Sequence, residues 1–452
     1  MIEDIVSKFG GSSLANARQI DAVREIVESD PRRRFVVLSA PGTDDEHKTK
    51  VTDSLLNIAT DGEHFRKKGK SISAKESHDY VVNRFGRIIT DLGIEGNDLM
   101  ENLRRDLQNP IEGKKRADFF ASRGEHYHAQ IIARYFKKRG LSAIVRLPED
   151  VGLFVSNNFG NAKVLPISYS NLEKLKLEQG IVVFPGFYGI TEDKDVAVFS
   201  RGGSDLTGGE LAFAINTSLY ENWTDTDGIY QADPRLITDA KVIPRLTYKE
   251  IRILAAKGFN VFHYGAMLNC KNRNIPINVR NTNNPSAPGT MIVSERVPEE
   301  TVVGIARLDD VASVYIEKDM MDEEIGFTHD LLKIFKEYEV STHHYPTDID
   351  DIAVLVAQKD LVGKANDVRA AIERRMNPDR IEMTYNLSIV SPVGIGMKGH
   401  PEVEAIATTA LAKRSIVPIV STKSPAQISH IFAVEGYNAD NALHALYDAF
   451  LM

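Results

Sequence analysis

Strand-like and helix-like patterns alternate at the start of the chain. Residues 2–9 are predicted to form the first strand, and residues 35–39 are a short apolar run typical of a strand covered on both faces. Between them, residues 16–28 place their apolar side chains on one helical face, and Pro31 stops that helix. Strand, helix and strand in this order form a βαβ unit, so the sequence predicts a parallel sheet.

The pattern then becomes helical and highly charged. We predict a helical insertion beside the sheet in residues 63–117, followed by a helix at 118–139. The second helix contains Gly124, and a glycine inside a helix costs about 1 kcal/mol relative to alanine. We therefore expect another part of the chain to approach Gly124 closely. Later apolar runs predict strands at 143–147, 163–167, 181–187, 196–199, 219–224 and 276–280.

Two glycine-rich turns each lie between a predicted strand and a helix. The first is Lys8–Ser13, and the second is Phe199–Gly209. Such a turn presents free backbone N–H groups and the positive end of a helix dipole, which suits a phosphate. Neither turn has the glycine spacing of a P-loop or of a Rossmann dinucleotide site. The two turns together favour an enzyme that handles more than one negative group.

After about residue 299 the predicted elements become shorter and repeat in outline. Two βαββαβ-like units of roughly 75 residues each fit ferredoxin-like sensor modules of small molecules. The strands are expected at 301–306, 312–317, 352–357, 393–397, 416–421 and 428–434, with one strand or a pair at 381–390. The helices are expected at 328–338, 360–375, 401–414 and 438–450.

Composition narrows the class of protein. A chain of 452 residues is expected to form two or three domains. It is 42% hydrophobic with no apolar run long enough to span a bilayer, and its N-terminus does not resemble a signal peptide. The single cysteine, Cys270, excludes an intrachain disulfide framework and a multi-cysteine metal site. A cytoplasmic protein is the expectation.

The charge pattern gives no sign of a nucleic-acid groove or of a membrane surface. The net charge is −8, and the chain lacks a long basic block. Two short basic runs, Arg32–Arg34 and Arg66–Lys68, are interpreted as solvated surface.

The two glycine turns carry the candidate chemistry. Lys8 and Arg201 are placed to neutralise nucleotide phosphates or the charge of a phosphoryl group in transfer. Asp205 has two interpretations, a helix-capping carboxylate or a site residue. Glu125 also has two, a helix-surface charge or a site residue. An acceptor that is already a carboxylate is ionised at pH 7 and needs no general base.

Four ordered motifs resemble those of the aspartokinases, members of the amino-acid kinase family. They are Lys8–Ser13, Ser122–Glu125, Ser200–Asp205 and Trp223–Arg235. The resemblance covers the whole chain. It implies an α/β fold: a parallel-sheet αβα sandwich kinase domain in residues 1–297, followed by two tandem ferredoxin-like βαββαβ ACT domains in 298–452.

The resemblance implies ATP-dependent phosphorylation of the β-carboxylate of L-aspartate, the first step towards lysine, threonine and methionine. It assigns the ammonium group of aspartate to Glu125 and its α-carboxylate to Arg201. Asp205 and Ser204 belong to the same substrate loop, and Thr52 resembles a substrate-loop threonine. The catalytic residues it implies are Lys8, Arg201 and Asp205.

The same resemblance implies where the nucleotide binds. Lys8 contacts the transferring phosphate, and Mg²⁺ is expected with the ATP phosphates and without a dedicated protein metal site. The chain is expected to form a homodimer or a dimer of dimers, with a possible amino-acid effector at residues 320–327 and 347–351 of the ACT domains. The other nucleotide-binding residues implied are Gly10, Gly11, Ser12, Thr224, Asp225, Tyr230 and Arg235.

The chain departs from the family pattern at two places. Asn260 stands where the family has a lysine facing the nucleotide, and Lys257 or Lys271 is a candidate substitute. Ala426–Ser429 replaces an effector-binding pattern. Two alternatives therefore stay open: a kinase for another acidic metabolite, such as glutamate or carbamate, and a non-catalytic amino-acid sensor.

Overall fold

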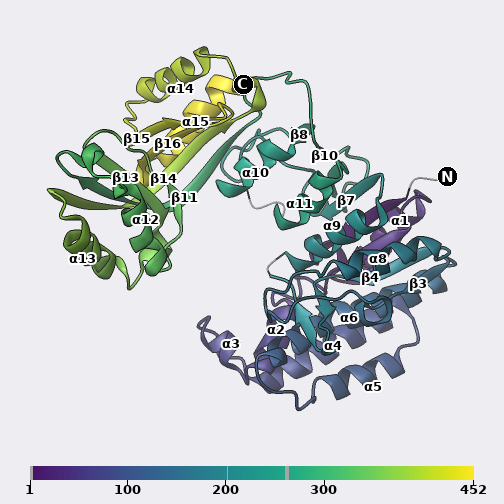
Figure 1. Cartoon of the computed structure of the whole chain (residues 1–452). Coiled ribbons are helices and arrows are strands. Elements are labelled where there is room, and N and C mark those ends of the chain that lie inside the picture. The colour runs from purple at the N-terminus through teal and green to yellow at the C-terminus, as the bar shows by residue number, and fades with distance from the viewer. Residues whose placement is uncertain (1–3, 201, 260–263) are drawn as a thin grey trace. The chain divides into compact units, whose positions relative to one another are not determined.

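The computed structural model of the chain describes residues 4–200, 202–259 and 264–452 (Figure 1). The chain divides into two compact units. The first comprises Met1–Ile229, Val242–Tyr248 and Val261–Arg296. The second comprises Tyr230–Lys241, Lys249–Asn260 and Val297–Met452. Among the described residues, no helix is long and apolar enough to cross a membrane.

In its described part, the first unit is built on an eight-stranded sheet with the order β3-β4-β2-β1-β7-β9-β10-β8. The strands from β3 to β9 run parallel, as predicted, while β10 pairs antiparallel with β9 and parallel with β8. The strand bounds are β1 Ile5–Phe9, β2 Phe35–Leu38, β3 Ala143–Val145, β4 Ile181–Pro185, β7 Leu219–Thr224, β8 Arg245–Thr247, β9 Ile277–Asn281 and β10 Thr290–Val293. A separate hairpin pairs β5 Tyr188–Ile190 with β6 Val196–Val198.

Helices pack on this sheet, and the predicted helical insertion shares its core. Val81 and Leu103 of that region belong to the same buried cluster as Phe9 and Val36 of the central strands. The insertion is thus fastened to the sheet by apolar burial, and Figure 1 shows α4, α5 and α6 lying together. The helices of this unit are α1 Ala17–Glu28, α2 Val51–Ala59, α3 Glu63–Arg66, α4 Ala74–Leu92, α5 Asn97–Asp106, α6 Lys115–Lys138, α7 Pro148–Val151, α8 Ile167–Glu173, α9 Gly203–Ile215 and α11 Tyr264–Asn272. Helix α10, Tyr248–Ala256, belongs to the second unit except for its first residue.

Two predicted strands, 163–167 and 393–397, are wrong; the second falls where a strand ends at Val393 and a 3-10 turn covers Ile395–Met397. Val164 makes only an isolated bridge with Val155, and α8 begins at Ile167. Pro166 immediately precedes this helix. Proline lacks an N–H for a strand ladder, and its fixed φ suits a helix start, so the local backbone favours the helix.

The basic run Arg32–Arg34 is not uniformly solvated, which corrects the sequence interpretation. Arg33 is buried, and its Nε donates to Glu221 at 2.8 Å. Arg280, Trp223 and Ser7 also donate to this carboxylate. Burial alone raises the pKa of Glu221, but the hydrogen bonds and charge of its partners, chiefly Arg33, bring the pKa below its ordinary value. By contrast, Arg66–Lys68 is exposed, as predicted.

We expect Arg33→Met to lower the free energy of unfolding by about 3–5 kcal/mol, because it leaves a buried carboxylate without its main partner. The measurement is urea-induced unfolding followed by circular dichroism. The matched control is Arg32→Met, because Arg32 pairs with Asp30 at the surface, and a loss below about 1 kcal/mol is expected there. Equal losses in the two variants would contradict the structural role of Arg33.

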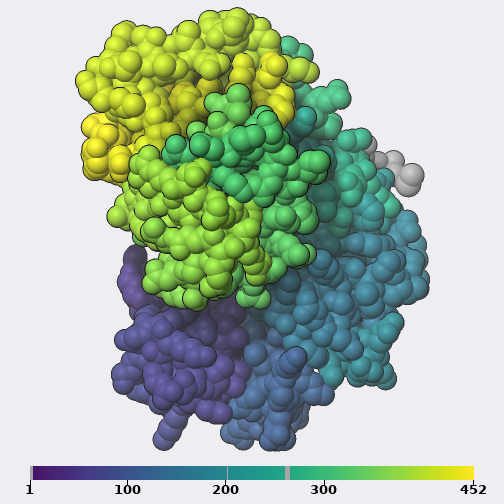
Figure 2. Space-filling model, turned by 60° about the vertical axis from the view of Figure 1, so that its left-hand side comes forward, coloured from purple at the N-terminus to yellow at the C-terminus, as the bar shows by residue number. Residues whose placement is uncertain are grey.

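In the second unit, a six-stranded sheet has the order β12-β13-β11-β14-β16-β15 in the described residues. The strands are β11 Gly304–Glu317, β12 Thr342–His344, β13 Asp351–Ala357, β14 Arg380–Val393, β15 Val420–Lys423 and β16 His430–Glu435. The helices are α12 Phe327–Glu337, α13 Ala365–Met376, α14 Glu402–Lys413 and α15 Ala439–Phe450. Figure 2 shows the surface of the C-terminal part of this unit, from about residue 300, in green to yellow.

The two ferredoxin-like modules share their central strands. The sequence predicts separate strands at 301–306 and 312–317, but β11 runs through both. The pairing of β11 with β14 shifts register between Leu308 and Val311. Asp310 takes a left-handed φ of 56° there. A β-bulge therefore accounts for the break in the apolar pattern, because it displaces one residue without ending the strand.

Candidate functional site

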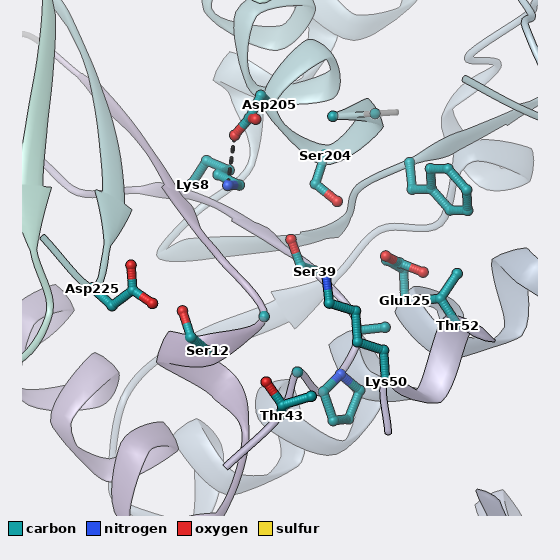
Figure 3. A pocket seen from close by; sticks show the side chains of 17 residues that line it. Lys8, Ser12, Ser39, Thr43, Lys50, Thr52, Glu125, Ser204, Asp205 and Asp225 are labelled. Atoms are coloured by element: carbon teal, nitrogen blue, oxygen red, sulfur yellow. Dashed lines mark ion pairs between the residues drawn. The ribbon is translucent and has the colours of Figure 1, made fainter. Parts of the chain in front are cut away.

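A cavity of about 410 Å³ lies at the carboxyl ends of the central parallel strands of the first unit. Lys8 comes from the end of β1, Ser39 follows β2, Phe187 lies just beyond β4 and Asp225 follows β7. The carboxyl edge of a parallel sheet is where open α/β folds bind ligands. The residues named from the sequence that line this cavity are Lys8, Gly11, Ser12, Thr52, Glu125, Ser204, Asp205 and Asp225 (Figure 3).

Lys8 is held by an ion pair across the cavity wall. Its Nζ lies 2.5 Å from Oδ1 of Asp205, which is in the first turn of α9 (Figure 3). The same carboxylate oxygen accepts a hydrogen bond of 2.8 Å from Asn222. Asn222 and Lys8 are paired in register on the adjacent strands β7 and β1. Asp205 therefore orients the ammonium group of Lys8, and the N-cap position of α9 is taken by Gly202.

Glu125 is buried on α6 and faces the cavity, so it is not a helix-surface charge. Burial raises the pKa of its carboxyl group to about 8, although an N–H of Ala40 donates to it. Its Oε2 has no hydrogen-bond partner among the described residues. A buried carboxylate oxygen without a partner is costly. It is suited to receive a positively charged group of a ligand.

Gly124 allows this placement of Glu125. A Cβ at residue 124 would lie 2.8 Å from the Cβ of Ala40 and 3.4 Å from Leu55. The expectation that something approaches this glycine closely is therefore confirmed. The loop after β2 and helix α2 both pack directly against α6, and they bring Ala40 and Thr52 to the cavity.

Glycines at the two turns allow close backbone packing and a left-handed backbone conformation beside the cavity. A Cβ at Gly42 would lie 2.4 Å from the backbone of Gly11, so the first turn packs against the loop after β2. Gly202 precedes α9 with a φ of 80°, a left-handed conformation that favours glycine. The following N-terminus of α9 presents Ser204 to the cavity and brings a positive dipole end with it.

Several residues named from the sequence lie elsewhere. Gly10 and Thr224 adjoin lining residues, but they do not line the cavity themselves. Tyr230 and Arg235 belong to the second unit, where Arg235 pairs with Asp233 at the surface. Arg201 and Asn260 lie outside the described residues.

The two lysines considered as substitutes for Asn260, Lys257 and Lys271, both lie among the described residues. Lys257 belongs to the second unit, where its Nζ donates to Ser391. Lys271 lies in α11 and does not line the cavity.

The structure adds lining residues that the sequence did not indicate. Ser39, Thr43 and Lys50 project from the segment that follows β2, and Figure 3 shows the amine of Lys50 directed into the cavity. Ser39 was recognisable in principle, because it ends a strand next to the one that carries Lys8. Its carbonyl is fixed by Nδ1 of His128 at 2.8 Å. Burial lowers the pKa of His128 to about 4, so this imidazole is neutral and donates.

The described part of the chain contains no metal site made of protein side chains alone. Among the residues that the structure describes, no group of three His, Cys, Asp or Glu side chains is arranged to hold an ion. His126 and His128 have separate partners: His126 contacts the hydroxyl of Tyr188, and His128 contacts Ser39.

Comparisons with known proteins agree with this architecture. The model of the "Amino acid kinase family" matches residues 4–281, and that of the "ACT domain" matches 390–450. Aspartokinase 3 of Bacillus subtilis is 39% identical, with 98% of each chain covered. The crystal structure of Clostridium acetobutylicum aspartate kinase superposes with a TM-score of 0.86 at 32% identity, covering 99% of this chain and 100% of that one.

A more distant structure supports the fold. Escherichia coli aspartokinase III, solved in complex with aspartate and ADP, has a TM-score of 0.80 at 23% identity, and both chains are fully covered. The predicted α/β kinase fold with ferredoxin-like ACT domains is confirmed by the strand order and by these matches. The chain belongs to the amino acid kinase family and, within it, to the aspartokinases.

Proposed function

We propose that this chain transfers the γ-phosphoryl group of ATP to the β-carboxylate of L-aspartate and forms 4-phospho-L-aspartate, the first step towards lysine, threonine and methionine. One observation carries the proposal: a single cavity contains both the ammonium group of Lys8 and a carboxylate oxygen of Glu125 that has no partner among the described residues. Lys8 suits a phosphate and Glu125 suits an amino group. A kinase whose acceptor is an amino acid needs both.

The acceptor is held by its charged groups. Glu125 pairs with the ammonium group of aspartate, and Arg201 binds the α-carboxylate. Ser204 and Thr52 line the same cavity and offer hydroxyl groups. Asp205 arranges this region through its contacts with Lys8 and Asn222. With both charged ends fixed, only the β-carboxylate is free to attack.

The donor is held mainly by its phosphates. Lys8 binds the transferring phosphoryl group, and the turn of Gly10, Gly11 and Ser12 cradles it. In this proposal Thr224, Asp225, Tyr230 and Arg235 contact the remainder of the nucleotide. Mg²⁺ accompanies ATP and takes most of its ligands from phosphate and water. Asp225 is the lining carboxylate best placed to contact it, since Asp205 and Glu125 have the other roles.

The chemistry needs no general base, because the attacking carboxylate is already ionised at pH 7. Catalysis then rests on positioning and on stabilising the negative charge that spreads over the phosphoryl oxygens. Lys8 supplies that stabilisation. When bound, Mg²⁺ neutralises further phosphate charge.

Acceptor specificity tests the proposal. ADP formation by the purified chain is measured with aspartate, glutamate and carbamate as acceptors, and aspartate is expected to be strongly preferred. Preference for glutamate or carbamate would replace this proposal with a kinase for that metabolite. Binding of aspartate and ATP by calorimetry without any ADP formation would instead identify a sensor that has lost turnover.

Binding of aspartate is expected to release close to one proton per site at pH 7. The pKa of Glu125 is raised to about 8 in the free protein, so the group is mostly protonated at pH 7 and must ionise to pair with an ammonium group. The release should shrink as the pH rises through about 8. Calorimetry in buffers of different ionisation enthalpy measures it. A release that does not change between pH 7 and pH 9 would rule out Glu125 as its source.

The stability of the unliganded protein provides a second readout of the same group. A carboxyl with a raised folded-state pKa favours folding below its ordinary pKa of 4.5, and this contribution is lost as the pH rises towards 8. Glu125→Gln should therefore reduce the loss of stability between pH 5 and pH 8 in urea unfolding.

The proposal extends to assembly, location and regulation. We propose a cytoplasmic homodimer or dimer of dimers, to be measured by light scattering coupled to gel filtration. An amino-acid effector is proposed at residues 320–327 and 347–351. The rate of ADP formation with and without lysine, threonine and methionine tests it.

A further inference from the structure

A second cavity, of about 600 Å³, lies wholly within the second unit. One wall is the C-terminal end of α10 with the residue that follows it, Lys257. The other walls are the loop after β12 and the hairpin between β15 and β16. None of the proposed effector residues 320–327 and 347–351 lines it.

The floor of this cavity is the face of the sheet opposite the helices. Ile431 lies between His430 and Phe432 on β16, and Phe432 packs in the cluster that includes α14 and α15. Successive side chains of a strand point to opposite faces, so Ile431 points away from the helices. Ile431 shares a separate apolar cluster with Ile389 and Leu308, and all three line the cavity.

The walls are cationic. Lys257, Arg252 and Lys423 line the cavity, and no carboxylate does so among the residues that the structure describes. The hydroxyl-bearing residues Thr422, Ser424 and Ser429 contribute further polar groups. Cations, hydroxyls and an apolar floor together suit an organic anion.

Lys257 is the central feature. It is 5% exposed, and its Nζ donates to Oγ of Ser391 at 2.7 Å. Ser391 in turn donates to the carbonyl of His430, so this hydroxyl accepts from Lys257 without neutralising it. No carboxylate lines the cavity around Lys257 among the described residues, and burial lowers the pKa of Lys257 to about 7. A buried ammonium group without an anion is costly to the fold, and a bound anion would relieve that cost.

Neighbouring groups do not supply the missing charge. Burial lowers the pKa of His344 to about 4 and also lowers that of His343, so both imidazoles are neutral at pH 7. The nearest acidic influences are Asp360 on His343 and Glu404 on His430, and neither residue lines the cavity. Glu250 of α10 accepts from the backbone N–H of Ile395.

We propose that this cavity binds a small organic anion. Its carboxylate or phosphate head lies on Lys257, with Arg252 and Lys423 at the rim, and its apolar body lies on Leu308, Ile389 and Ile431. The site is separate from the catalytic cavity and from the proposed effector residues. Helix α10 begins at Tyr248 of the first unit and continues into the second, so the ligand contacts a segment through which the chain passes between the two units.

The test uses the full chain with methyl-labelled isoleucine, observed by NMR. The probes are phenyl phosphate, phenylacetate, inorganic phosphate and neutral benzyl alcohol. All titrations are done in the Lys8→Met background, which removes the main phosphate contact of the catalytic cavity. The two organic anions are expected to shift the methyl signals of Ile253, Ile389 and Ile431. Inorganic phosphate should bind more weakly, and benzyl alcohol should bind weakest.

Lys257→Met should weaken binding of the organic anions by about tenfold or more, because a charged hydrogen bond is lost. Lys423→Met is the second variant in case Lys257→Met fails to fold, and a smaller loss is expected for it. The exposed Lys67→Met is the control without effect. The proposal is overturned if no organic anion shifts these methyls at millimolar concentration, or if neutral and anionic probes bind equally. Aspartate-dependent ADP formation is measured separately, so a failure of the kinase assignment leaves this result interpretable.

Discussion

Lys8→Met is expected to lower kcat for aspartate-dependent ADP formation by about 10²- to 10³-fold, the usual effect of removing one preorganised group that stabilises transition-state charge. Lys8 is 7% exposed and is oriented by Asp205 and Asn222, so its ammonium group is fixed before the substrate arrives. A smaller change is expected in KM for aspartate, because Lys8 acts on the phosphoryl group. Steady-state kinetics with a coupled ADP assay separates the two parameters.

The matched control is Lys115→Met. Lys115 also forms an ion pair, with Asp195 at 2.9 Å, but it does not line the cavity. Near-normal turnover is expected for it. The melting temperature of each variant shows whether the fold is retained, since Asp205 keeps Asn222 as a donor after Lys8 is removed. Normal turnover of a folded Lys8→Met protein would refute the role of Lys8.

Glu125→Gln is expected to raise KM for aspartate by about 10- to 150-fold, the range for losing a hydrogen bond between charged groups. Glutamine has nearly the same shape and can still accept from the N–H of Ala40, so the cavity should keep its form. The substitution removes only the negative charge for the ammonium group. Affinity for ATP, measured by calorimetry, should be unchanged.

Glu210→Gln controls for the loss of a buried carboxyl group. Glu210 is also buried, its pKa is likewise raised by burial, to about 7, and it accepts from Tyr169 and Asn269 outside the cavity. KM for aspartate should be unaffected in this variant. An equal rise in both variants would indicate a general disturbance of the fold, and no rise in Glu125→Gln would remove Glu125 from the substrate site.

Many helices and strands were predicted correctly, because capping side chains, prolines and the spacing of apolar residues act between neighbours in the chain. Helix α1 begins after Asn16, whose side chain accepts from the N–H of Gln19, and ends before Pro31. The predicted strand at 163–167 fails because apolar content alone does not separate a strand from a helix start at a proline. The β-bulge in β11 was not predicted either, because the extra residue interrupts the apolar pattern in the same way as a loop would.

The candidate site was predictable where a motif stays within one turn. Lys8, Gly11 and Ser12 come from one such turn, and Ser204 and Asp205 from the other. Asn222 and Ser39 were not predicted to lie near Lys8, because they are brought there by the order of the strands, in which β2 and β7 flank β1. Glu125 was ambiguous, since a charged residue on a helix has the same local pattern whether it faces solvent or a cavity.

The sequence by itself determined the alternation of strands and helices, the two glycine turns and the motifs that mark an aspartokinase, because each depends on residues close together in the chain. Tertiary structure alone decided which charges are buried and what they face. Arg33 is buried because Glu221 reaches it from a strand nearly two hundred residues away. Among the described residues, Oε2 of Glu125 has no hydrogen-bond partner and no carboxylate lines the cavity beside Lys257, because distant segments close around both groups. Desolvation is a property of the packed chain, and it turns ordinary charged residues into candidate binding groups.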